Sequence, residues 1–196
     1  MDNKQVDIVM TFHDIVNVIM WDDSQNKNGE SSRVPCGAKV ALWLARAFTL
    51  SNVSKYRDRG MFVLAKYYKK NLPDAEKHLK DVQEFYITQI RQYRKEAKAN
   101  PLISLVALDN VIEPVNFEIK VMPCPPVLMF VRTNMLCDEA HTELRKLYMC
   151  GGMTKSEYFK QRRELFRPIN RFRADFAATY SSAGKLSREA QEKAGD

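Results

Sequence analysis

The predicted fold depends on residues 130–166, which read FVRTNMLCDEAHTELRKLYMCGGMTKSEYFKQRRELF. The double glycine at 151–152 can end a helix in the left-handed backbone conformation. The TKSE motif that follows is a capping box, in which Thr154 and Glu157 can each bond the other's amide and so start a second helix near Lys155. The segment therefore predicts two amphipathic helices that are joined by a tight turn.

Upstream of this turn, the sequence predicts a β-strand over residues 127–135. One alternating set of its residues is almost wholly apolar and would face a core, while the other set becomes polar towards Arg132 and Asn134 and would point away. A second strand is predicted at residues 115–121, where VNFEIKV alternates apolar and polar side chains. The five prolines between residues 101 and 126 are expected to exclude long helices there.

The N-terminal part is predicted to be largely helical. Residues 7–21 are rich in β-branched side chains and fit either a strand or a helix, and the polar stretch 22–33 is typical of an exposed loop. Helices are expected at three further segments: 37–50, 56–70 and 73–99. The third is expected to open with Pro73 in its first turn. At the other end of the chain, Pro168 should end or kink its helix, and the small polar residues after 180 should fray.

A strand followed by two short helices cannot bury its apolar surface alone, so two copies are expected to pair their 127–135 strands across a twofold axis. The predicted class is mainly α with a short β-ribbon, that is α+β. The expected organisation is a helical N-terminal region at 1–112, a ribbon-helix-helix DNA-binding and dimerisation module at 113–173, and a C-terminal extension at 174–196 with a flexible end.

The charge distribution favours an anionic partner. The chain carries a net charge of +7 with a pI of about 9.2, and residues 132–173 hold ten Lys and Arg against five Asp and Glu. Such a concentration is typical of nucleic-acid binding, although it also serves solubility. The N-terminus lacks a signal peptide, and no apolar run approaches the ~18 residues of a membrane span. A cytoplasmic location without a membrane partner is therefore expected.

Residues 130–166 resemble ribbon-helix-helix modules, the group that includes the Arc and methionine repressors. In the order of its parts, the chain also resembles the AcaB-like transcriptional regulators of conjugative plasmids and integrating conjugative elements. This order runs from RDRGMFVLAKYYKK at 57–70 through the proline-punctuated strands to a final basic helix. The resemblance implies transcriptional regulation of conjugative transfer genes. We expect a homodimer that binds double-stranded promoter DNA and acts as an activator, with RNA polymerase as a further candidate partner of the N-terminal helices.

The same resemblance implies which residues contact DNA. The predicted base contacts are Arg132, Asn134, Phe130 and, if the strand register slips by one residue, Thr133. Arg can donate to guanine and Asn can bond adenine in the major groove. The predicted phosphate contacts lie at the second helix: Thr154, Lys155, Ser156, Arg162 and Arg163. The structural alternatives are a charged edge strand that resists aggregation and a solubilising helix face.

Two other classes of function are an enzyme and a non-catalytic component of a conjugation system. The three histidines are far apart and no catalytic or cofactor-binding motif is present, so an enzyme and a cofactor are not expected. Cys137 and His141 could share one helix face at a metal, but a pair of core side chains is the favoured interpretation, and no metal site is predicted. The alternative function is a non-catalytic structural or protein-interaction component of a conjugation system. It would expose apolar surface on the N-terminal helices and cover Arg132 and Asn134.

Overall fold

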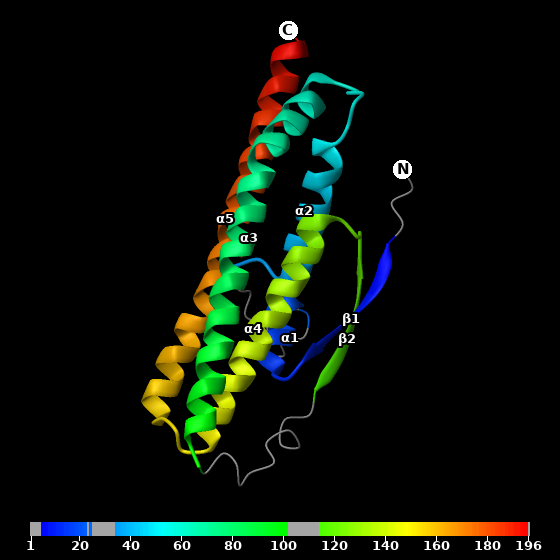
Figure 1. Cartoon of the computed structure of the whole chain (residues 1–196). Helices are drawn as coiled ribbons and strands as arrows, with labels where there is room; N and C mark the ends of the chain where they lie inside the picture. The colour runs from blue at the N-terminus through cyan, green and yellow to red at the C-terminus, as the bar shows by residue number, and fades with distance from the viewer. Residues whose placement is uncertain (1–4, 23, 25–33, 102–113, 196) are drawn as a thin grey trace.

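The computed structural model describes residues 5–22, 24, 34–101 and 114–195, so most of the predicted loop at 22–33 lies outside the described residues. Helices dominate these ranges (Figure 1). The elements follow in this order: β1 (Val6–Phe12), α1 (Ile15–Trp21), α2 (Gly37–Ser51), α3 (Arg59–Ala99), β2 (Val115–Val121), α4 (Pro125–Met149) and α5 (Lys155–Gly195).

Three long helices form the body of the molecule. α3 packs against both α4 and α5, and α3 and α5 run side by side along the length of the bundle (Figure 1). Polar contacts fix both interfaces: the Tyr86 hydroxyl donates to the Leu165 carbonyl at 3.0 Å, and the Gln83 amide donates to the Met129 carbonyl at 2.9 Å. The bundle thus brings the middle of the chain against its C-terminal part.

The predicted strand at 115–121 is confirmed as β2, but its partner is β1. The two strands are antiparallel, with a register that runs from Val6 opposite Val121 to Phe12 opposite Val115. Met10, Phe12, Ile119 and Val121 are buried, as expected when alternate side chains of a two-stranded sheet face a core. The ambiguous stretch 7–21 therefore contains both elements, and the Asp14 side chain caps α1 through the Val16 amide.

The predicted strand at 127–135 is wrong. The predicted ribbon-helix-helix module is therefore wrong as well, because this strand would have formed its ribbon. These residues lie in α4, whose first turn contains Pro125 and Pro126. Proline suits that position because the first helical amides have no partner within the helix. The two prolines therefore lie at the start of a long helix. The expectation that prolines exclude a long helix from this segment is wrong. The described residues contain no strand in the 113–173 segment other than β2.

Two prolines also fail to interrupt the long helices. Residues expected as two helices at 56–70 and 73–99 form the single helix α3, which contains Pro73, and α5 continues through Pro168 to Gly195. Each proline costs a backbone hydrogen bond, but the buried stripe runs on past it, through Leu72 and Leu79 in α3 and through Leu165 and Ile169 in α5. Tertiary packing thus outweighs the local penalty, and the residues after 180 continue α5 as far as Gly195.

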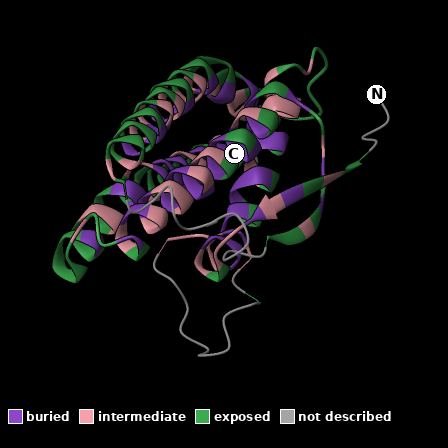
Figure 2. Cartoon of the chain, turned by 60° about the horizontal axis from the view of Figure 1, so that its bottom comes forward, coloured by how far each residue is buried: buried purple, intermediate pink, exposed green. Residues whose placement is uncertain are grey.

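One hydrophobic core joins the N-terminal and C-terminal parts. The Phe130 ring lies 5.7 Å from the Trp21 ring and 5.6 Å from the Phe172 ring, so α1, α4 and α5 meet at its centre. Buried residues line the inner sides of the helices, as Figure 2 shows. The expected domain boundary at 112 lies outside the described residues, and the one at 173 falls inside α5. Within the described ranges, no helix is long and apolar enough to cross a membrane.

Candidate nucleic-acid interface

The predicted base-reading residues do not form a common surface. Phe130 and Thr133 are fully buried, and Asn134 is 4% exposed. The Asn134 amide donates to the Phe130 carbonyl at 2.8 Å, and the Thr133 hydroxyl donates to the Met129 carbonyl at 2.7 Å. These three side chains therefore serve the packing of α4 and cannot reach a base edge in this fold. Arg132 alone points to solvent, from the outer face of α4.

The glycine turn and the capping box have the predicted geometry. Gly151 adopts a φ of 72°, and the Gly152 amide donates to the Leu147 carbonyl at 2.9 Å to close α4. The Glu157 carboxylate accepts from the Thr154 amide at 2.8 Å, while the Thr154 hydroxyl accepts from the Glu157 amide at 3.3 Å. The bonds to the Thr154 amide and hydroxyl hold the pKa of Glu157 below its usual value. α5 therefore begins at a fixed residue and angle.

This cap limits what the first turn of α5 can offer a phosphate. Thr154 also donates its hydroxyl to the Glu157 carboxylate at 2.7 Å, so its side chain is committed to the cap. The Glu157 charge itself lies at the helix N-terminus, where a phosphate would otherwise bind. Lys155 and Ser156 are exposed beside it and keep side-chain donors. The predicted phosphate contact at this turn therefore depends on Lys155 and Ser156 more than on Thr154.

A row of positive side chains follows along the outer face of α5. Its four residues recur at steps of three, four and four, which places them on one side of a helix, and all are exposed: Lys160, Arg163, Arg167 and Arg171. We call this set the α5 basic face. Residues 155–171 carry six Lys and Arg against two Glu, a balance of +4 that is more than half of the net charge of +7.

The α5 basic face is only lightly neutralised by the protein. Arg167 lies 3.3 Å from Glu164 and Arg171 lies 3.6 Å from Asp175, both pairs on the open surface with Arg side chains 75% and 77% exposed. Exposed pairs of this kind contribute ~0–1 kcal/mol, so a phosphate can displace them. In the described part of the chain, Lys160 and Arg163 have no acidic partner. The face is thus available to an anion.

Two other arginines of α5 are less exposed than the α5 basic face. Arg162 is half-buried, with its guanidinium 5.7 Å from the centre of the Phe166 ring. Arg173 is 3% exposed and donates from Nε to the Pro35 carbonyl at 2.8 Å. Helical spacing therefore separates the predicted Arg163 contact, which lies on the outer face, from Arg162, which lies against an aromatic ring. Lys160 belongs to the outer face and was missed, although the same spacing would have identified it.

A buried polar cluster lies between α1, α4 and α5, and sequence reasoning missed it as well. Asp138 is 1% exposed and accepts from the His13 amide, from His13 Nδ1 at 2.7 Å and from Asn17 Nδ2 at 2.6 Å. His141 is equally buried and lies 3.1 Å from the Tyr158 hydroxyl. Burial raises the pKa of Asp138, while the bonds from His13 oppose that rise. The cluster joins elements more than 120 residues apart.

The predicted Cys137 and His141 pair lies inside the core. Both side chains are 1% exposed, and burial raises the pKa of the Cys137 thiol to about 12, which leaves it protonated and a poor metal ligand. Within the described ranges, no group of three or more His, Cys, Asp or Glu side chains could hold a metal ion. The core interpretation of this pair therefore fits the geometry better than a metal site.

Comparisons with known proteins add no further constraint on this site. No family model matches the chain, and no curated protein and no solved structure matches it either.

Proposed function

We propose that this protein binds double-stranded DNA through the α5 basic face and acts in the cytoplasm as a non-catalytic transcriptional regulator. The observation that carries the proposal is the alignment of Lys160, Arg163, Arg167 and Arg171 on one exposed, lightly neutralised helix face. From Lys160 to Arg171 the helix rises about 17 Å, which matches the axial length of about five base pairs. Such a face can follow the phosphates of one DNA strand.

The mode of binding differs from the one expected from the sequence. A ribbon that reads bases through residues 130–134 is excluded because these residues are helical and three of the predicted contacts are buried. Phosphate contacts supply most non-specific affinity but carry no sequence information directly. The resemblance to AcaB-like regulators supports the narrower proposal that the target is promoter DNA of conjugative transfer genes and that the outcome is activation.

A charge-neutralised variant tests the proposal. Replacing Arg163, Arg167 and Arg171 together by Gln keeps side-chain polarity and removes three positive charges from the face. The matched control replaces Lys70, Lys77 and Lys80 by Gln, because these three residues are exposed on the outer side of α3. Affinity for duplex DNA is measured by fluorescence anisotropy over a salt series. Each phosphate contact contributes about 0.9 to the slope of log affinity against log salt.

We expect the α5 variant to lose at least about tenfold in affinity at ~0.1 M salt and to reduce the slope by about 2–3, while the α3 control keeps the wild-type slope. Arg132→Ala should leave the affinity for DNA unchanged. If Arg132 read bases from a β-ribbon, the same substitution would weaken binding. Equal losses in both triple variants would place the DNA on a different surface, and no binding by the wild type at ~50 mM salt would refute DNA binding.

A second candidate is a protein-interaction component of a conjugation system, which one observation favours. Large apolar side chains of the N-terminal elements are exposed: Val9 at 54%, Ile15 at 59% and Leu42 at 66%. Exposed apolar surface is typical of a protein contact when the side chains are contiguous. A wild-type protein that binds no DNA at ~50 mM salt would favour this protein-interaction function over DNA binding.

A further inference from the structure

The β-sheet of this protein has two strands in the described ranges, so β2 has an outer edge. β2 pairs with β1 on one side, and within the described ranges no strand pairs with its other side. An unpaired edge presents a row of amide and carbonyl groups that can pair with another strand. Natural proteins usually cover or interrupt such an edge, so its accessibility in this fold decides whether it can bind a partner.

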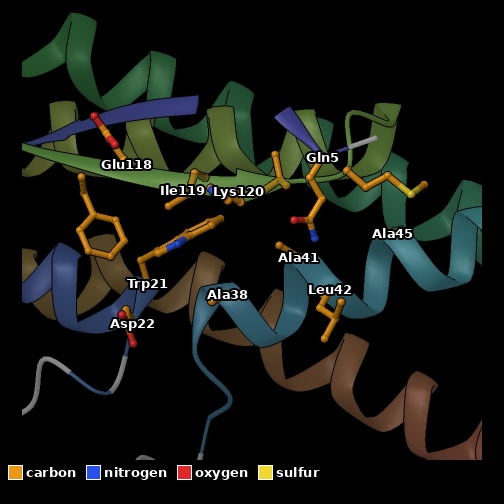
Figure 3. Close-up of a pocket in the computed structure, with 13 residues that line it drawn as sticks. Gln5, Trp21, Asp22, Ala38, Ala41, Leu42, Ala45, Glu118, Ile119 and Lys120 are labelled. Atoms are coloured by element: carbon orange, nitrogen blue, oxygen red, sulfur yellow. The ribbon is translucent and has the colours of Figure 1, made fainter. Parts of the chain in front are cut away.

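A pocket of about 270 Å³ opens along this edge, between β2 and α2 (Figure 3). Every residue from Phe117 to Met122 lines it, both those that face the core and those that face outward. The pocket therefore borders the edge of β2, where side chains of both faces are within reach. On the opposite side, α2 contributes only small side chains and one large one: Ala38, Ala41, Ala45 and Leu42.

The α2 wall of this pocket is apolar, and it is exposed at Ala38 and Leu42, whereas Ala41 and Ala45 are buried. Leu42 is 66% exposed, the largest exposed fraction among the large apolar side chains of the described chain. Alanines at steps of three and four residues allow a sheet to approach a helix closely. One more strand beside β2 would lay its inward side chains over this wall, so the wall is suited to an apolar strand face.

The sequence of β2 is complementary to itself in one antiparallel register. In an antiparallel pair, residues directly opposite each other point to the same face of the sheet. A twofold axis that relates two copies of β2 must therefore pass through a residue of the strand and not between two residues. An axis at Ile119 places Glu118 opposite Lys120 of the second copy, and Lys120 opposite its Glu118. Phe117 then lies opposite Val121 of the second copy on the inner side. Axes at residues 118 or 120 would place like charges opposite each other, which is unfavourable.

We propose that two copies of this protein pair through the free edge of β2, in the antiparallel register centred on Ile119, to form a four-stranded sheet. The inner faces of both strands lie on the same side of the new sheet, so the apolar layers that contain Phe117, Ile119 and Val121 in each copy meet across the new strand pair. The two Glu118–Lys120 pairs lie on the outer face and select the register. This surface is separate from the α5 basic face and does not depend on DNA binding.

Charge reversal on β2 tests this interface in the full-length chain. Both Glu118 and Lys120 are exposed and point away from the core, so their substitution should leave the fold intact. Sedimentation equilibrium measures the dimer affinity of wild type, Glu118→Lys, Lys120→Glu and an equimolar mixture of the two variants. In the mixture, a lysine of one chain again lies opposite a glutamate of the other at both positions. Val9→Thr is the matched control, because Val9 is exposed on β1 away from the free edge, and this substitution adds no charge opposite Glu118.

We expect the wild type to dimerise, each single variant to lose roughly tenfold in dimer affinity, and the mixture to recover it as a heterodimer. Val9→Thr should dimerise like the wild type. Thermal melting separates folding from pairing, because Lys120 also lies opposite Asp7 in its own chain and Lys120→Glu places two acidic residues there. A monomeric wild type would overturn the proposal, and so would a dimer that all variants form equally well, since that dimer would use another surface.

Discussion

The carboxylate of Asp138 accepts a hydrogen bond from His13 Nδ1 at 2.7 Å, and both of its oxygens lie 3.0 Å from the His13 amide. His13 directly follows β1, whereas Asp138 lies in the middle of α4. Asn17 of α1 adds a third donor at 2.6 Å. One buried carboxylate thus holds the β1–α1 junction against the central helix, and it fixes where the two-stranded sheet sits on the bundle.

The substitution Asp138→Asn should therefore destabilise the fold by about 2–4 kcal/mol, because an amide group cannot accept from three donors and leaves buried polar groups unpaired. Urea denaturation at pH 7 measures the effect. Asp175→Asn is the matched control, since Asp175 forms only an exposed pair with Arg171 and should change stability by less than about 0.5 kcal/mol. A similar, small effect at both positions would show that the Asp138 bonds contribute little.

The buried His141 should make the fold sensitive to acid. Burial lowers its pKa from 6.5 to about 4; nearby Arg162 and Arg145 act in the same direction, and Asp14 opposes them. A histidine with a lowered pKa in the folded state binds its proton more readily when unfolded. The free energy of unfolding should therefore fall as pH drops from about 6.5 to about 4, by up to about 3 kcal/mol from this residue.

His141→Phe should flatten this part of the stability profile, measured by urea denaturation at a series of pH values. Tyr158→Phe is the control, because it removes the hydroxyl 3.1 Å from His141 but leaves the imidazole buried, so the pH dependence should persist. If His141→Phe keeps the wild-type slope between pH ~4 and ~6.5, other groups must cause the acid sensitivity.

The sequence predicts those parts of the structure that depend on contacts between neighbouring residues. The Thr154–Glu157 box and the turn at Gly151 involve atoms within a few residues of each other, so the residue types alone predict them. The alternation of 115–121 likewise identifies β2, because only one of its faces is covered. Helical spacing also separates outward arginines from inward ones, which is how the α5 basic face could have been predicted in full.

The segment 127–135 could not be predicted in the same way because it is covered on several sides. α4 contacts α2, α3, α5 and β1, so residues of both alternating sets become buried, including Val127, Phe130, Val131 and Asn134. A sequence that is apolar at most positions fits a strand period and a helix period equally well. The bond between His13 and Asp138 spans 125 residues, and no local pattern predicts such a contact.

The capping box should contribute measurably to stability. Thr154→Ala removes the acceptor of the Glu157 amide and one partner of the Glu157 carboxylate, and should lower the free energy of unfolding by about 1 kcal/mol. Because the pKa of Glu157 is lowered by its bonds to Thr154, its contribution is present above pH ~4.3 and is lost as pH falls below that value. Ser156→Ala, at a residue between Thr154 and Glu157 that takes no part in these bonds, should have little effect. Equal effects of both substitutions in chemical denaturation would contradict the assigned cap.

Gly37 should tolerate no larger residue, because α2 begins directly against the buried ring of Trp21. A Cβ atom at Gly37 would lie 2.7 Å from Trp21 Cε3 and 3.2 Å from its Cα atom. Trp21 is 2% exposed and its ring stacks on Phe130, so it has little room to move. Gly37→Ala should therefore lower the free energy of unfolding by about 1–3 kcal/mol.

Gly184→Ala is the control, because Gly184 is a helical position with open space around it. This substitution should instead stabilise α5 by about 0.5–1 kcal/mol. Chemical denaturation of the two variants compares the same added methyl group in two environments. If Gly37→Ala is as stable as Gly184→Ala, Trp21 does not fix the start of α2.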